Sequence, residues 1–151
     1  MTLALRPLTP ADAARAAVLH AQGFADAWSE ASLSGLIAEP NVLALGAQAG
    51  SALIAFALFQ SAAGDTELLT IATDPARRGE GHGRRLIEAA LAPLAAAGNT
   101  RLLLEVAEDN APARHLYAGL GFTLDGRRKG YYTAGRAAPV DALLMSRPLG
   151  G

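Results

Sequence analysis

The chain has 151 residues, of which 51% are hydrophobic and 18% are charged, and its formal net charge is -1. These values are typical of one globular domain whose core needs no metal or disulfide, and the near-zero charge argues against a dedicated nucleic-acid-binding protein. Cysteine is absent, which excludes disulfides, thiolate metal sites and a covalent acyl-thiol intermediate. We therefore expect a single domain over residues 1–151.

The sequence shows no membrane-spanning segment. Its longest apolar run, Ala52–Phe59, is far shorter than the roughly 20 residues that cross a bilayer. The first ten residues contain Arg6 and two prolines where a secretory signal would need an apolar stretch. We expect a cytoplasmic protein.

The first half of the chain carries the signals of two helices. Thr9 can cap a helix with a proline and Asp12 in its first turn, and this pattern predicts a helix that runs to about Gly23. Ser29 predicts a second helix through Ile37. The expected strands of this half are Leu3–Arg6, Asn41–Gln48, Ser51–Gln60 and Thr66–Thr73. The third of these is apolar throughout, so we place it inside the sheet with both faces covered.

The second half alternates strands and helices. A helix is expected from about Gly83, because apolar residues recur there at helical spacing, and Pro93 either kinks this helix or ends it early. Another helix is expected over Asn110–Gly119, with Leu116 and Leu120 facing inward. The remaining strands are Arg101–Val106, one that follows Gly121-Phe122, and Val140–Met145. This element order predicts an α/β domain with a mixed, mostly antiparallel central sheet and helices on both faces.

A glycine-rich loop precedes the helix that begins near Gly83. Its sequence, Arg78-Gly79-Glu80-Gly81-His82-Gly83-Arg84, leaves backbone N–H groups free at the positive end of a helix, where a pyrophosphate binds well. Its arginines can add charge-assisted hydrogen bonds. The loop matches neither the Walker A pattern nor the dinucleotide fingerprint, which argues against kinases and dehydrogenases. The alternative is an ordinary glycine-rich turn beside solvated arginines.

The same loop resembles the Q/R-x-x-G-x-G/A acetyl-coenzyme A loop of the GNAT superfamily of N-acetyltransferases. Segments on either side fit at the right spacing, namely Leu68–Pro75, Leu104-Glu105-Val106 with Asn110, and Leu116–Phe122. The resemblance implies one N-acetyltransferase domain that uses acetyl-CoA as its acetyl donor, without a metal. The residues expected to bind acetyl-CoA are Ile71, Ala72 and Thr73 through their backbone, and Arg78, Gly79, Glu80, Gly81, His82, Gly83, Arg84 and Asn110.

Within the superfamily, the chain is most similar to the bacterial ribosomal-protein alanine N-acetyltransferases. The segments that carry this likeness are Phe24, Trp28-Ser29-Glu30, Asp65–Leu69, Arg128 with Tyr131-Tyr132, and Asp141-Ala142. The chain departs from the family pattern at Ala27 and Thr133, where the family usually has proline. The resemblance implies that the acceptor is a protein N-terminus, specifically the N-terminal alanine of a small-subunit ribosomal protein.

Acetyl transfer to an amine needs a proton acceptor for the ammonium group and a proton donor for the departing thiolate. Glu105 follows an apolar strand segment and can act as the base, directly or through water, although an ion-paired glutamate is the alternative. Tyr117 can act as the acid, because a phenol of ordinary pKa about 10 stays protonated. A core aromatic packed against Phe122 is the alternative for Tyr117. The resemblance implies both catalytic roles.

Three aromatic residues are candidates for the acceptor site. Trp28, Tyr131 and Tyr132 offer large contact areas with a polar edge, and we expect them to form a wall that grips a peptide end. Core packing explains each of them equally well. Asn110 either caps the following helix or touches the cofactor. The histidines have no metal-ligand spacing, so no metal is expected.

Three functions remain open at this point. The first is acetyl transfer from acetyl-CoA to a protein N-terminus. The second keeps acetyl-CoA and replaces the acceptor with a small-molecule amine. The third is a non-catalytic acyl-CoA-binding module, against which the presence of both Glu105 and Tyr117 argues. We expect neither a nucleic acid nor a membrane as a partner.

Overall fold

The computed structural model describes residues 3–150, and its helices and strands follow the predicted order. Two 3-10 turns, Pro10–Asp12 and Pro75–Arg77, supplement them. The strands are β1 Leu3–Pro7, β2 Val42–Ala49, β3 Ala52–Ala62, β4 Asp65–Thr73, β5 Arg101–Ala107, β6 Thr123–Tyr132 and β7 Val140–Pro148. The α-helices are α1 Ala13–Gly23, α2 Glu30–Ala38, α3 His82–Ala96 and α4 Ala111–Gly119.

The strands form one 7-stranded sheet in the order β1-β2-β3-β4-β5-β7-β6. Neighbouring strands are antiparallel except for β4 and β5, which are parallel because α3 carries the chain across between them. The expected mixed, mostly antiparallel sheet is therefore confirmed. As predicted, β3 lies inside the sheet, and all its residues from 53 to 59 are buried.

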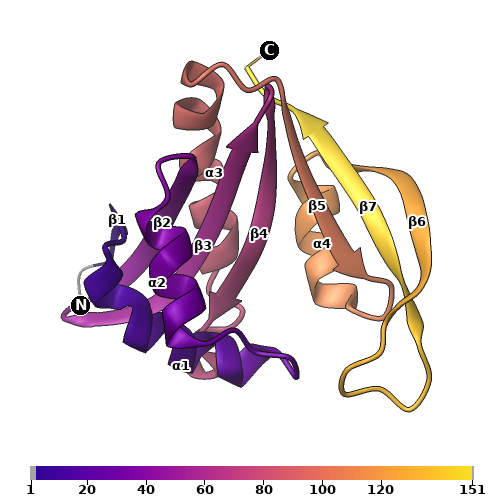
Figure 1. Ribbon diagram of the computed structural model, residues 1–151, viewed down its shortest axis with the longest axis horizontal. Helices are drawn as coiled ribbons and strands as arrows, with labels where there is room; N and C mark the ends of the chain where they lie inside the picture. The colour runs from indigo at the N-terminus through magenta and orange to yellow at the C-terminus, as the bar shows by residue number, and fades with distance from the viewer. Residues whose placement is uncertain (1–2, 151) are drawn as a thin grey trace.

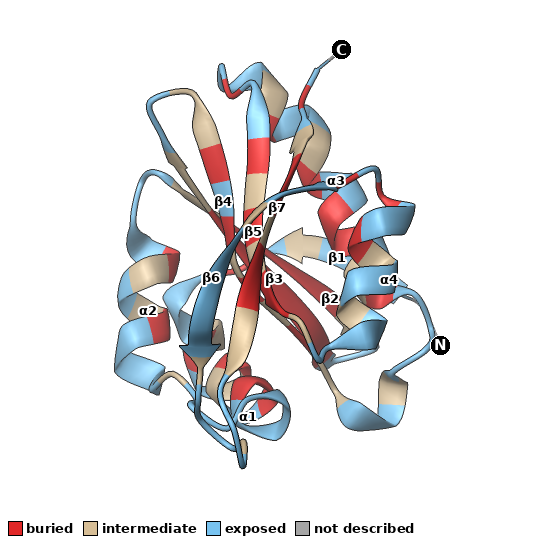
Figure 2. Cartoon of the chain, turned by 90° about the vertical axis from the view of Figure 1, so that its right-hand side faces the viewer, coloured by how far each residue is buried: buried red, intermediate tan, exposed pale blue. Residues whose placement is uncertain are grey.

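Helices cover both faces of this sheet (Figure 2), as the sequence predicted. On one face α1 and α2 pack around Phe56, which is completely buried with Leu19 and Leu33. On the other face α3 and α4 pack around Phe59, which points the opposite way along β3. Within residues 3–150, no helix combines the length and apolarity that a membrane span requires.

Capping side chains fix where the helices begin. Ser29 Oγ accepts a hydrogen bond from the Ser32 N–H at 3.1 Å, as expected for the cap of α2. The helix expected after Thr9 starts as a 3-10 turn and becomes α-helical at Ala13. α3 does not end at Pro93 but continues to Ala96, because the proline lies in the last turn, on the exposed side.

The pairing of β4 with β5 is short. It joins Asp65–Glu67 to Arg101–Leu103 and then stops, and the two strands diverge (Figure 1). Leu58 pairs with Thr70 and the next β3 residue pairs with Leu68, so Leu69 is an extra residue that forms a β-bulge in β4. A bulge bends its strand, and β4 stays bonded to β3 while its other edge loses its partner. Beyond this short pairing, the sheet has a gap between β4 and β5.

Candidate active site

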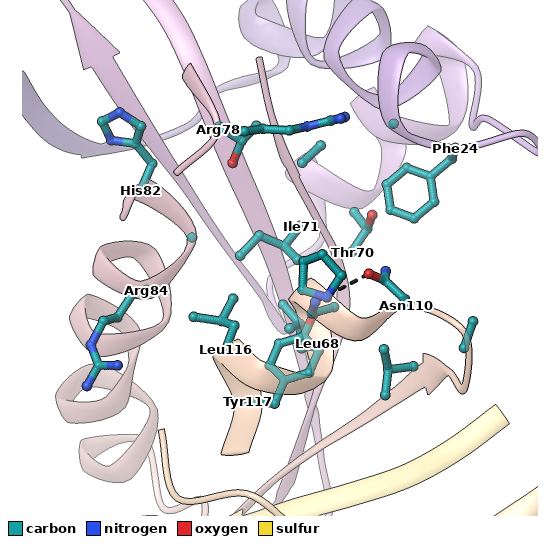
Figure 3. Close-up of a pocket in the computed structure, with 18 of the residues that line it drawn as sticks. Phe24, Leu68, Thr70, Ile71, Arg78, His82, Arg84, Asn110, Leu116 and Tyr117 are labelled. Atoms are coloured by element: carbon teal, nitrogen blue, oxygen red, sulfur yellow. Dashed lines mark hydrogen bonds between the residues drawn. The ribbon is translucent and has the colours of Figure 1, made fainter. Parts of the chain in front are cut away.

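A cleft of about 790 Å³ lies where β4 and β5 diverge (Figure 3). It is lined by β4, β5 and α4, together with the loop before α3 and the end of α1. Both expected catalytic residues, Glu105 and Tyr117, line it. It is also lined by most residues expected to bind the acetyl donor: Ile71, Ala72, Thr73, Arg78, Gly79, Gly81, His82, Gly83, Arg84 and Asn110.

The β4 side of the cleft offers main-chain groups. Residues 70–73 pair with β3 on one edge, and their other edge faces the cleft instead of a strand. Along a strand, the N–H and C=O groups point alternately to the two edges, so some of these groups are directed into the cleft. An extended ligand with amide groups can bind such an edge in the way that an additional strand does.

The loop before α3 has the conformation that only glycine adopts readily. Gly79 and Gly81 have positive φ angles of 82° and 84°, and Gly81 is the N-terminal cap of α3. A Cβ atom on Gly83 would lie 3.4 Å from Ile71 Cδ1 and from Leu116 Cδ2, so this glycine lets the helix approach β4 and α4 closely. The first N–H groups of α3 therefore lie beside the cleft without intrahelical partners.

Glu80 is the one loop residue of the expected set that does not line the cleft. Its carboxylate accepts a hydrogen bond from His82 Nε2 at 2.8 Å and lies 3.4 Å from Arg77 Nη1. The bond from His82, with a smaller contribution from Arg77, lowers the pKa of the exposed Glu80 carboxyl. These contacts hold the side chain of Glu80 within the loop, so the carboxylate does not face the cleft.

Glu105 lies in β5 with its side chain 26% exposed, and its carboxylate is paired with Arg128. Arg128 Nη1 donates to Glu105 Oε1 at 2.8 Å from β6. Glu67 lies nearby on β4: burial and then the charge of Glu105 raise the pKa of the Glu67 carboxyl. The ion-paired glutamate considered from the sequence is therefore present, and the same carboxylate also faces the cleft.

Tyr117 is only 5% exposed and lies in α4 at the inner end of the cleft. Its ring packs edge-on against Phe122 with 5.7 Å between ring centres, so the core contact expected as an alternative exists together with the contact to the cleft. Burial, with a smaller contribution from Tyr132, raises the pKa of Tyr117 to about 12. The phenol is therefore a proton donor over the whole neutral range.

The three aromatic candidates for the acceptor site occupy different positions. Tyr132 is half-buried and lines the cleft. Tyr131 is 47% exposed beneath Arg128, whose guanidinium carbon lies 3.8 Å from its ring centre. Trp28 does not line the cleft but stacks on His20 at 5.0 Å. The structure thus brings one of the three to the cleft and gives Trp28 a packing role.

Phe24, and not Trp28, is the aromatic residue of the segment between α1 and α2 that lines the cleft (Figure 3). It follows the last turn of α1 and is 42% exposed. Thr70 of β4 and Leu116 of α4 also line the cleft, although neither was a candidate. The signal for Thr70 was its place in the strand before the glycine-rich loop, where every residue from 68 to 73 borders the cleft.

Asn110 combines its two expected roles. Its Oδ1 accepts a hydrogen bond from the Ala113 N–H at 3.3 Å, which caps α4, and the residue also lines the cleft. Among the residues that the structure describes, no group of histidine, aspartate and glutamate side chains is arranged to hold a metal ion.

The raised pKa of Tyr117 predicts a specific loss of stability in alkali. In the unfolded chain the phenol ionises near its ordinary pKa of 10.0, whereas the folded protein holds its proton until about 12. The folded state therefore binds more protons between these values, and the free energy of unfolding falls as pH rises by up to about 1.4 kcal/mol per pH unit. Urea unfolding at pH 9 and pH 11 should show a smaller fall for Tyr117→Phe than for the parent chain. Equal falls would contradict a buried, neutral phenol.

The chain is similar to known acetyltransferases over nearly its whole length. Residues 12–122 match the family model described as the acetyltransferase (GNAT) family. N-alpha-acetyltransferase RimI of Mycobacterium tuberculosis is 38% identical over 149 residues, which cover 95% of this chain and 90% of that protein. The ribosomal protein bS18-alanine N-acetyltransferase of Salmonella typhimurium is 33% identical over 142 residues, 94% of this chain and 95% of that one.

The fold of the chain is also similar to that of a solved acetyltransferase structure. The crystal structure of the ribosomal-protein-S18-alanine N-acetyltransferase from Escherichia coli superposes with a TM-score of 0.92 at 29% identity, and covers 99% of this chain and 96% of that chain. The matches in sequence agree with two features of the structure, the cleft between the diverging strands and the glycine-rich loop. The chain belongs to the GNAT family of acetyltransferases, and acetyl-CoA is its acetyl donor.

Proposed function

We propose that this enzyme transfers the acetyl group of acetyl-CoA to the α-amine of a protein N-terminus, and that its acceptor is the N-terminal alanine of a small-subunit ribosomal protein. The observation that carries the reaction is the placement of a carboxylate, Glu105, and a neutral phenol, Tyr117, on one cleft between β4 and β5. The acceptor follows from the relatives, whose names state alanine N-acetylation of ribosomal protein bS18 and which align with nearly the whole chain. The proposed unit is one domain over residues 1–151, acting in the cytoplasm.

The residues of the cleft fit the chemical groups of acetyl-CoA. The free edge of β4 at Ile71, Ala72 and Thr73 suits the amide groups of the pantetheine arm, which would bind as an added strand. The N–H groups from Gly79 to Arg84 suit the pyrophosphate, with Arg78 as a nearby cation. Both features favour an extended, amide-containing ligand with a diphosphate at one end.

Glu105 is the proposed general base. It would accept a proton from the acceptor ammonium, directly or through water, and the neutral nitrogen would then form a bond to the thioester carbonyl carbon. Arg128 is half-exposed, so its ion pair with Glu105 is one that water screens and an incoming ammonium can replace. The proton leaves Glu105 for solvent after the acetylated product has departed.

Tyr117, the residue expected to act as the acid, is proposed to donate a hydrogen bond to the departing sulfur. When the carbon–sulfur bond breaks, the electron pair stays on sulfur, and the thiolate of CoA needs a proton or a hydrogen bond. Because burial holds the pKa of Tyr117 near 12, whereas a thiol titrates at about 8.5, early and complete proton transfer is unfavourable. A hydrogen bond to the developing negative charge is therefore the main contribution of the phenol. The second proton of the attacking nitrogen, which is lost as the amide forms, neutralises the thiolate as CoA is released.

Removing the charge of Glu105 should separate catalysis from cofactor binding. Glu105→Gln is expected to lower kcat by about 10² to 10⁴, the usual contribution of a positioned base, with little change in the Kd for acetyl-CoA. The matched control is Glu108→Gln, because Glu108 is also near the end of β5 and is paired with an arginine, Arg127 at 2.9 Å. The control should keep its activity. Turnover of Glu105→Gln at the parent rate from pH 6 to 9 would refute the base assignment.

The acceptor class is tested with matched peptides. A peptide with a free N-terminal alanine should react at least tenfold faster, in kcat/KM, than the same peptide with a bulky first residue. The reason is that we place the first residue of the acceptor against Phe24 and Tyr132, which line the cleft. A peptide with a blocked N-terminus and one lysine should not react. If the lysine peptide or a simple polyamine reacts as fast as the alanine peptide, the small-molecule or general amine alternative replaces this one.

A further inference from the structure

One buried ionisable group has no part in the proposed chemistry. His20, in the last turn of α1, is only 1% exposed and does not line the cleft. Its ring lies between the two segments that form one side of the cleft, the α1–α2 connection (residues 24–29) and β4. A buried histidine needs a partner for each ring nitrogen, and this one has two.

The hydrogen bonds of His20 define its protonation state. Nδ1 lies 3.1 Å from the backbone N of Trp28, and a backbone N–H can only donate, so Nδ1 must be unprotonated. The single proton of the neutral ring is then on Nε2, which donates to Thr70 Oγ1 at 3.1 Å. The imidazole therefore joins α1, the α1–α2 connection and β4 only when it is neutral.

The surroundings of the ring disfavour its charged form. Phe24 stacks on it with ring centres 4.2 Å apart, Trp28 stacks at 5.0 Å, and Phe56 lies tilted at 6.5 Å. Burial lowers the pKa of His20 below its ordinary value of 6.5. Within the part of the chain that the structure describes, the ring makes no ion pair with the ionisable residues of the elements around it, which are Arg15 on α1, Asp26 in the connection, Glu30 on α2, and Asp65 and Glu67 on β4.

Two neighbours of the ring connect it to the site. Phe24, which stacks on the imidazole, and Thr70, which accepts its hydrogen bond, both line the cleft. Phe24 lies on one side of the cleft, near Thr70 (Figure 3). A change in the contacts of His20 therefore reaches the cleft wall through Phe24 and Thr70.

We propose that His20 is a positioning residue whose neutral imidazole holds the α1–α2 connection against β4 and so shapes the acceptor side of the cleft, and that protonation of Nδ1 in mild acid releases this connection. Protonated Nδ1 is a donor, and it would face the Trp28 N–H, which is also a donor. The bond is then replaced by a repulsive contact. The effect on acceptor binding rests on the proposed function. The release of the α1–α2 connection does not depend on it.

The sign of the pH effect follows from the direction of the shift. The folded state disfavours the imidazolium form. The contact of the α1–α2 connection with β4 is therefore stabilised at neutral pH, and this stabilisation is lost as pH falls below 6.5.

Trp28 provides a direct spectroscopic test, because it is the only tryptophan of the chain. Its fluorescence emission should shift to longer wavelength between pH 8 and pH 4.5 with a midpoint below 6.5, while the far-ultraviolet circular dichroism stays constant. The shift should disappear in His20→Asn, which cannot titrate, and should persist in the control His115→Asn, which alters an exposed histidine of α4. An unchanged emission over this range, or the same transition in His20→Asn, overturns the proposal.

Kinetics with two variants separate positioning from general stability. His20→Asn places an amide oxygen where Nδ1 lies and keeps an acceptor for the Trp28 N–H, whereas His20→Leu keeps neither hydrogen bond. At pH 8, His20→Leu should raise the KM for the alanine peptide at least fivefold, with the Kd of acetyl-CoA unchanged. His20→Asn should have a KM close to that of the parent chain. Equal values of KM for the two variants and the parent chain refute the positioning role. If no peptide reacts with the parent chain, the proposed function fails, and the fluorescence result still decides the release of the connection.

Discussion

The early separation of β4 from β5 is the constraint on which the rest of the site depends. Their pairing ends at Glu67, and the bulge at Leu69 keeps β4 attached to β3 while it turns away from β5. Backbone groups in the middle of a sheet are normally paired, and leaving them unpaired away from water is costly. This sheet therefore presents a row of donors and acceptors that an extended ligand can satisfy, and the other features of the site are arranged around that row.

The two residues proposed to act in catalysis lie in different environments. Tyr117 is almost fully buried, which raises its pKa and keeps the phenol neutral. The Glu105 side chain is 26% exposed and its carboxylate is paired with Arg128, a half-exposed partner that an incoming cation can replace. The fold places these two residues on one cleft, one on β5 and the other on α4.

Local signals in the sequence were sufficient to predict much of the fold. Capping residues and hydrophobic periodicity located the helices, and the glycines at 79, 81 and 83 located the loop, because these features act within a few residues of one another. Long-range packing was less predictable. The position of Trp28 on His20 instead of the cleft depends on how α1 lies against β4, and the pairing of Arg128 with Glu105 depends on the register of β6, β7 and β5. Neither arrangement leaves a periodic signal in the sequence.

In the proposed complex acetyl-CoA binds as an added strand on the free edge of β4, and amide hydrogen exchange tests this mode of binding. Saturating acetyl-CoA, without an acceptor, should slow exchange at the amides of residues 69–73 that do not bond to β3, and at the start of α3 near Gly81 and Gly83. Amides at the centre of β3, which are already paired on both sides, should not change. Full binding that leaves exchange along β4 unaltered would contradict this account of the cleft.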